Sequence, residues 1–146
     1  MTHGGPARHI LSRKMAQHNE TGRRGEELAC RYLARQDYRL LDRNWRCGHL
    51  EIDIIADDFG EVVFVEVKTR RDETLANAAD AVTLEKKKHL LDAARAYLAQ
   101  KQLDQPFRFD IITVVGERPP FRLTHIRNAF STESVHYQIS PHRYGH

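Results

Sequence analysis

Two β-branched segments joined by a short polar turn constrain the fold of this chain more than any other feature. Residues 50–56 read LEIDIIA, residues 61–69 read EVVFVEVKT, and DDFG stands between them. Runs rich in Val and Ile favour strands, and Asp and Gly between two such runs favour a turn. The segments therefore predict a β-hairpin, whose second strand is apolar enough to be buried on both faces.

The other elements follow from the periodicity on either side of this hairpin. Apolar residues recur at helical spacing over residues 22–36 and 83–100. Further strands are predicted for YRLLDRNW (38–45), FRFDIITVV (107–115) and FRLTHIRNAF (121–130). The predicted order is α-β-β-β-α-β-β, which indicates an α/β fold with a mixed β-sheet and flanking helices.

At 146 residues the chain has the size of a single domain. Residues 1–20 are polar and show no sustained periodicity, so we expect a flexible N-terminal arm, within which Met15 is an alternative start. Residues 131–146 are expected to form a loosely ordered C-terminal tail. The folded domain is therefore predicted over residues 21–130.

The composition restricts which binding partners and which cellular compartment we expect for this protein. A formal net charge of +3 permits a polyanionic partner without requiring one. Cys30 and Cys47 lack the spacing of a metal site or a disulfide framework, which favours a reducing compartment. No segment has the length of a bilayer span or the apolar run of a secretory signal. We therefore expect a cytoplasmic protein that does not contact a membrane.

Three charged residues, Asp53, Glu66 and Lys68, interrupt the apolar hairpin. Because side chains alternate along a strand, Glu66 and Lys68 share one face. The same alternation predicts that Asp53 faces away from both Ile52 and Ile54.

The expected turn brings the two carboxylates together. With the turn centred near residues 58 and 59, Asp53 lies opposite Phe64, and Glu66 is its diagonal neighbour. Diagonal neighbours are roughly 7–8 Å apart, close enough for two carboxylates to share one cation. Oxygen ligands of this kind suit Mg²⁺ or Mn²⁺, which activates water and polarises a phosphodiester. Lys68 beside that ion would orient the water or stabilise the developing charge.

A plain structural interpretation competes with this one. Glu66 and Lys68 would form an ion pair on a solvated sheet face, and Asp53 would be a surface acid, as is common on half-exposed sheets. The surrounding sequence VVFVEVKT is nearly continuous in apolar residues, however. Charges are rare in such a strand unless they have a function, which favours the metal site.

Charged residues outside the hairpin extend the candidate site. Glu26 lies on the inward face of the first helix, which favours a functional role, whereas its neighbour Glu27 lies on the solvated face. Lys86 begins the second helix and would contact a phosphate or simply cover the edge of the core. Arg70 and Arg71 leave the strand just past Lys68, where they favour contact with a nucleic-acid backbone over a role as ordinary strand-end charges.

Five blocks in order resemble a known family: TGRRGEELACRYL, NWRCGHLEIDIIA, VVFVEVKTR, AVTLEKKKHLLDAARAYL and FRFDIITV. They resemble the YraN family of small bacterial proteins, over about residues 22–130. That family is similar to archaeal Holliday junction resolvases, within the PD-(D/E)xK nuclease superfamily. The resemblance implies a restriction-endonuclease-like fold and a homodimer.

The resemblance also implies roles for individual residues. The superfamily's aspartate, glutamate and lysine fall on Asp53, Glu66 and Lys68, and the acid carried on a helix falls on Glu26. The backbone carbonyl of Val67 would be a further metal ligand. In one departure from the pattern, no proline precedes Asp53.

These observations together favour a Mg²⁺- or Mn²⁺-dependent endonuclease that hydrolyses phosphodiester bonds in DNA, with branched or damaged DNA as candidate substrates. Glu26, Asp53, Glu66 and Lys68 would be its catalytic residues. Two alternatives remain open. One is a nucleic-acid-binding or scaffold protein that retains the fold without turnover, and the other is a nuclease that acts on RNA.

Overall fold

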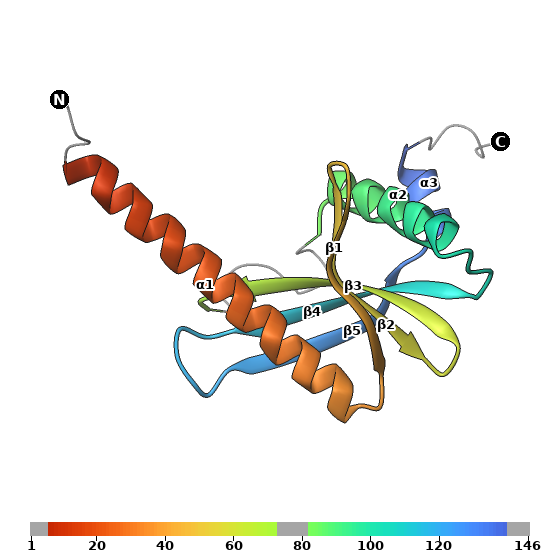
Figure 1. Cartoon of the computed structure of the whole chain (residues 1–146), viewed down its shortest axis with the longest axis horizontal. Helices are drawn as coiled ribbons and strands as arrows, with labels where there is room; N and C mark the ends of the chain where they lie inside the picture. The colour runs from red at the N-terminus through yellow and green to blue at the C-terminus, as the bar shows by residue number, and fades with distance from the viewer. Residues whose placement is uncertain (1–5, 73–81, 140–146) are drawn as a thin grey trace.

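The predicted hairpin forms the centre of a five-stranded sheet in the order β1-β2-β3-β4-β5 (Figure 1). The computed structural model describes residues 6–72 and 82–139, and the side chains of residues 20–72 and 82–136. β3 and β4 run parallel, and the other neighbouring strands are antiparallel. The strands are β1 (Arg39–Cys47), β2 (Leu50–Asp58), β3 (Glu61–Arg70), β4 (Phe107–Val115) and β5 (Arg122–Phe130).

Helices cover both faces of this sheet, so the predicted mixed α/β fold and its element order are confirmed. α1 (Pro6–Arg35) crosses one face, and α2 (Leu84–Gln100) lies on the other (Figure 1). Thr83 caps α2, because its side-chain oxygen accepts a hydrogen bond from the backbone N–H of Lys86. Each helix buries an apolar side against the strands beneath it.

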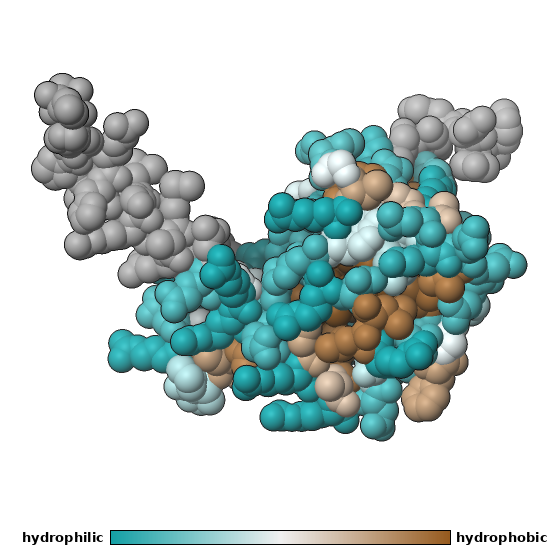
Figure 2. Space-filling model, in the orientation of Figure 1, coloured by the Kyte–Doolittle hydropathy of each residue, from teal (hydrophilic) through white to brown (hydrophobic). Residues whose placement is uncertain are grey.

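The alternation of side chains along β3 divides the core in two. Val63 and Val65 pack under α1 with Leu33, whereas Val62 and Phe64 pack under α2. All five are at most 1% exposed, which confirms the strand as buried on both faces. The face of the molecule seen in Figure 2 is mostly hydrophilic, and the hydrophobic residues on it gather beside α2.

The turn of the β2–β3 hairpin differs from the prediction by one residue. Its central residues are Phe59 and Gly60, both with positive φ (50° and 98°), the conformation of the tight turns that fit twisted hairpins. Because the turn centre moves by one residue, the pairing register moves by two. Phe64 therefore pairs with Ile55, and the expected pairing of Phe64 with Asp53 is wrong.

Both expected terminal segments contain helix. α1 begins at Pro6, inside the predicted arm, because residues 6–19 are mostly good helix formers and proline is tolerated in a first helical turn. The predicted tail contains α3 (Thr132–Ile139), whose Val135 is fully buried in the core beneath α2. Helix therefore extends past residues 21 and 130 on both sides, and the domain boundaries stay a prediction. Among the described residues, no helix is both long and apolar enough to cross a membrane.

A buried network around Asp110 joins β4 to β5. The Asp110 carboxylate accepts hydrogen bonds from Arg108 Nε (3.0 Å) and from the backbone N–H of Asn128 (2.9 Å), and it lies 2.7 Å from His125 Nε2. Burial by itself raises the pKa of Asp110, but these hydrogen bonds outweigh burial and hold the pKa below its ordinary value. The bond to the Asn128 backbone gives Asp110 a structural role.

Arg108 extends the network to the turn end of the hairpin. Its Nη1 lies 2.8 Å from Asp58 Oδ2 and 2.6 Å from Glu61 Oε1, the two residues that flank the turn. Its Nη2 donates to the Tyr38 hydroxyl at 2.8 Å. One guanidinium therefore joins β2, β3 and β4, and the residue that precedes β1, at this end of the sheet.

Asp110→Asn should lower the free energy of unfolding by about 3 kcal/mol at pH 7, since it removes the charge that compensates buried Arg108. A carboxyl whose pKa is lower in the folded protein than in the unfolded chain stabilises the fold at pH values above its ordinary pKa. This stabilisation is lost as the pH falls through the folded-state pKa. The stabilities of wild type and variant, measured by urea unfolding, should therefore begin to converge as the pH falls below about 4. Exposed Asp104→Asn is the control, and a difference that is constant with pH would contradict the charge network.

A close approach of α1 to β3 at Gly25 fixes the height of that helix over the sheet. A Cβ on Gly25 would collide with Thr69 Oγ1, whereas a Cβ on Gly22 would meet nothing within 4 Å. The absence of a side chain at Gly25 therefore lets the helix rest directly on the strand.

Gly25→Ala should destabilise the protein by about 1–2 kcal/mol, since overpacking outweighs the gain in helix propensity. Gly22→Ala on the same helix should be neutral or stabilise by up to about 1 kcal/mol. Thermal unfolding of both variants measures the difference. Equal effects of the two substitutions would show that the contact with Thr69 does not matter.

Candidate active site

The candidate site lies where β2 separates from β3. The pairing of these strands runs from Asp58↔Glu61 to Ile54↔Val65, whereas β3 stays paired with β4 as far as Arg70. We call the point beyond Ile54 and Val65 the fork. β2 is paired with β1 along its length, so beyond the fork β1 is its remaining neighbour, and the β1–β2 connection reaches α2 (Figure 1).

The fork interrupts the predicted alternation of side chains along β2. Ile52 packs with Trp45 in the cluster under α2, whereas Ile54 packs in the cluster under α1. The expectation that these two isoleucines share a face is therefore wrong. Asn44 in β1 has a positive φ of 50°, which indicates the local backbone distortion beside the separating strand.

Asp53 lies at the fork and bridges the gap through its side chain. Its Oδ2 accepts a hydrogen bond of 2.9 Å from the backbone N–H of Val67. A carboxylate thereby satisfies a strand N–H that the backbone of β2 no longer reaches. This bond places Asp53 beside the residues of β3 that flank Val67, namely Glu66 and Lys68.

Glu66 lies on the α2 side of the fork with two lysines around it. Its side chain is 5% exposed, and its Oε1 lies 3.5 Å from Lys68 Nζ and 3.7 Å from Lys86 Nζ. Lys68 extends from the same strand face, as predicted, and Lys86 reaches down from the first turn of α2. The structure therefore joins Lys86 to the site, which sequence reasoning had left open.

Burial and mutual repulsion weaken the acidity of both fork carboxyls. Burial, and then the charge of Asp53, raise the pKa of Glu66 to about 7, although Lys86 and Lys68 act in the opposite direction. Burial also raises the pKa of Asp53, against the hydrogen bond from Val67. The pair favours either a proton or a cation over two bare negative charges.

Glu26 approaches Asp53 from the α1 side. Burial, and then the charge of Asp53, raise the pKa of Glu26, while the side chains of Asn44 and Arg43 lower it. The predicted inward face of Glu26 is thus confirmed. Its neighbour Glu27 pairs with arginines on the solvated side, as expected.

The donor set fits a hard divalent cation that keeps part of its water shell. Asp53 and Glu66 supply carboxylate oxygens in a partly buried position with excess negative charge. Mg²⁺ in proteins is commonly held by one or two carboxylates, with water and substrate phosphates as further ligands. The described residues contain no group of three or more Asp, Glu, His and Cys side chains that could hold an ion unaided. A carbonyl ligand from Val67 stays a prediction.

The two strand-end arginines lie at the end of β3, beside the β4–β5 loop. Arg71 pairs with Glu117 in the β4–β5 loop at 3.7 Å, and both side chains are well exposed. The backbone carbonyl of Arg70 accepts a hydrogen bond from the N–H of Gly116. Both arginines therefore lie where β3 meets this loop, and their contact with nucleic acid stays a prediction.

Sequence reasoning missed Asn44 and His89, and it assigned His49, a lone histidine in a loop, to the polar surface. Asn44 hydrogen-bonds Glu26 and has a left-handed backbone. The only signal for this in the sequence was the residue type, because asparagine adopts that conformation more readily than most residues. His49 and His89 meet edge to face at 5.8 Å and line a hollow of about 370 Å³ beside Lys86. Only the return of β1–β2 onto α2 brings these two histidines together.

Glu66→Gln should stabilise the metal-free protein at pH 8 by about 1–3 kcal/mol, because it removes a buried charge that Asp53 repels. A carboxyl whose pKa rises on folding binds its proton more tightly in the folded state. As the pH rises from about 4.5 to about 7, the free energy of unfolding of the wild type should therefore decrease, and that of the variant should decrease less. Urea unfolding in EDTA measures this, with exposed Glu51→Gln as the control. A variant less stable than wild type at pH 8 would indicate a structural ion pair.

Comparison with known proteins identifies the family. The model of "Uncharacterised protein family UPF0102" matches residues 25–114, which include every residue at the fork. UPF0102 proteins of Bacteroides fragilis and Bacteroides thetaiotaomicron are each 50% identical over 116 residues, 80% of this chain and 96% of theirs. One from Oleidesulfovibrio alaskensis is 48% identical over 101 residues, 68% of this chain and 50% of its own. The chain belongs to the UPF0102 family of small bacterial proteins, the YraN-like family that its sequence blocks resemble.

Proposed function

We propose that this protein is an endonuclease that uses Mg²⁺ or Mn²⁺ to hydrolyse phosphodiester bonds in DNA, with branched or damaged DNA as its substrate. The observation that carries the proposal is the pairing at the fork of Asp53 with buried Glu66, beside Lys68 and Lys86. Symmetric cleavage of two strands requires two copies of the site, so a homodimer is part of the proposal.

The side chains at the fork have distinct roles in this reaction. Asp53 and Glu66 would hold the cation, and the Val67 N–H keeps the Asp53 carboxylate at the gap between the strands. When bound, such a cation polarises a phosphodiester and lowers the pKa of water. Lys68 positions the attacking water and, with Lys86, offsets the charge that develops on the phosphoryl oxygens. Glu26 would orient water from the opposite side of the sheet.

One observation favours a non-catalytic alternative, a nucleic-acid-binding protein that retains the nuclease fold. Lys68 and Lys86 already lie beside Glu66, so part of its charge is compensated without any metal. In that reading the lysines would contact phosphate directly. Binding of DNA that is independent of Mg²⁺ and survives Asp53→Ala, with no cleavage, distinguishes the alternative from the nuclease.

Cleavage of linear, flapped, four-way and single-stranded substrates with Mg²⁺ or Mn²⁺ tests the proposal. Wild type should cut at least one DNA, and Glu66→Gln from the same preparation procedure should lose at least about 100-fold in rate. Lys68→Gln should keep cation binding, measured by calorimetry, and lose about 100-fold in rate. The same panel made of RNA decides between the two nucleic acids.

Lys88→Gln is the matched control for the lysine variants, because Lys88 is exposed on the same helix as Lys86. It should cut at the wild-type rate. Cation binding by wild type with no cleavage of any substrate would overturn the nuclease in favour of the binding protein. Equal residual cleavage by wild type and Glu66→Gln would indicate a contaminating enzyme.

A further inference from the structure

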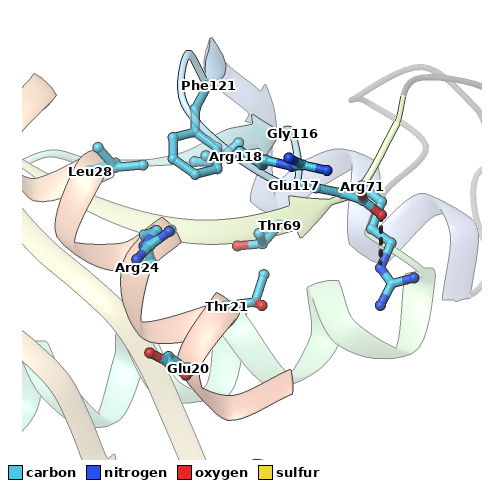
Figure 3. A pocket seen from close by; sticks show the side chains of 12 residues that line it. Glu20, Thr21, Arg24, Leu28, Thr69, Arg71, Gly116, Glu117, Arg118 and Phe121 are labelled. Atoms are coloured by element: carbon cyan, nitrogen blue, oxygen red, sulfur yellow. Dashed lines mark ion pairs between the residues drawn. The ribbon is translucent and has the colours of Figure 1, made fainter. Parts of the chain in front are cut away.

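A cavity of about 440 Å³ lies between α1, the end of β3 and the β4–β5 loop. In Figure 3 one wall is α1, with Arg24 and Leu28, and the opposite wall is the loop, with Arg118 and Phe121. Thr69 of β3 lies between these walls (Figure 3). We call this space the arginine cavity; its lining residues are Glu20, Thr21, Arg24, Gly25, Leu28, Thr69, Arg71, Val114, Gly116, Glu117, Arg118 and Phe121.

The polar side of the arginine cavity offers guanidinium groups to an anion. Arg24 lies over the ring of Phe121, 5.9 Å from its centroid, which orders its side chain at the cavity. Arg118 has no carboxylate partner within the described part of the chain. The pair of Arg71 and Glu117 is exposed and long at 3.7 Å, so a phosphate can replace the carboxylate at little cost. One guanidinium group can donate two parallel hydrogen bonds to two phosphate oxygens, which suits a phosphodiester.

The other side of the arginine cavity is apolar and the space exceeds what a phosphate fills. Leu28, Val114 and Phe121 contribute this wall. The volume of about 440 Å³ falls within the range of sites that enclose a small organic molecule, roughly 300–1,000 Å³. A nucleotide combines the two chemistries, since it joins a phosphate to an apolar base. A base can enter such a space only when it is outside the duplex stack.

The arginine cavity also lies close to the fork. Thr69 follows Glu66 by three residues along β3, which is about 10 Å at the rise of a strand. On α1, Gly25 packs against Thr69, and the next residue is Glu26, which approaches Asp53. The arginine cavity therefore adjoins the α1 side of the fork, where Glu26 meets Asp53, whereas the side chains of Glu66 and the two lysines lie on the other face of the sheet.

On the basis of the proposed nuclease function, we propose that the arginine cavity binds an unpaired nucleotide of the substrate strand next to the cleaved bond. Arg24 and Arg118 hold its phosphate, and its base rests against the apolar wall of Leu28, Val114 and Phe121. The site thus selects DNA that is unpaired beside the cleavage position, as at a flap, an end or a junction.

Binding of fluorescently labelled DNA to the full chain in EDTA tests this proposal without cleavage. Wild type should bind a duplex with a short single-stranded overhang about 10-fold more tightly than the same duplex with blunt ends. Arg24→Gln and Arg118→Gln should each weaken overhang binding about 10-fold and make the slope of log K against log salt shallower by about 0.7. Arg35→Gln, at the exposed far end of the same helix, should change neither quantity.

Three results of the binding measurement would overturn the proposal: equal affinity for blunt and overhang DNA, an unchanged salt slope in Arg118→Gln, or an effect of Arg35→Gln as large as that of Arg24→Gln. Competition separates a nucleotide site from a simple anion site. A deoxynucleoside monophosphate should displace the overhang at a lower concentration than inorganic phosphate, and equal competition would overturn the proposal. Because these measurements use no metal, a failure of catalysis leaves them unchanged, and the two proposals can fail separately.

Discussion

The hydrogen bond from the Val67 N–H to the Asp53 carboxylate is the interaction on which the site depends. At the fork β2 leaves β3, so a strand N–H loses its backbone partner, and a side chain takes that place. The same bond fixes Asp53 between the two faces of the sheet. Glu66 and the lysines then meet it from the α2 side, and Glu26 meets it from the α1 side.

The fork concentrates negative charge that a protein core does not ordinarily tolerate. Two carboxyls with raised pKa lie among buried Val and Ile side chains, and the two lysines compensate only part of their charge. Such an arrangement costs stability in the absence of a cation, as functional sites commonly do. A ligand that binds only the folded protein recovers that stability by mass action.

The opposite end of the hairpin offsets this cost. There Arg108 joins Asp58 and Glu61 across the tight turn, and buried Asp110 holds β4 to β5. In this network Asp58, Glu61 and Asp110 each lie within 3.0 Å of the Arg108 guanidinium, a closer pairing than that of Glu66 with its two lysines at the fork. The sheet is therefore firmly joined at the turn end and separated at the site end, and Gly25 sets how closely α1 approaches the separated part.

The sequence by itself determined the order and type of the strands, the buried nature of β3 and the residue types at the site. Local patterns carry that information: β-branched runs, helical spacing, and charges that interrupt an apolar strand. The helix over residues 6–19 was not predicted because it rests on helix propensity without an apolar stripe. The helix α3 was not predicted because Val135 is buried only by the core beneath α2. The register of the hairpin is set locally by the turn at Gly60. Only the tertiary structure decided the fork, the approach of Lys86 and the arginine cavity. Each of these depends on how segments distant in sequence pack together, and no local pattern in one segment specifies the position of another.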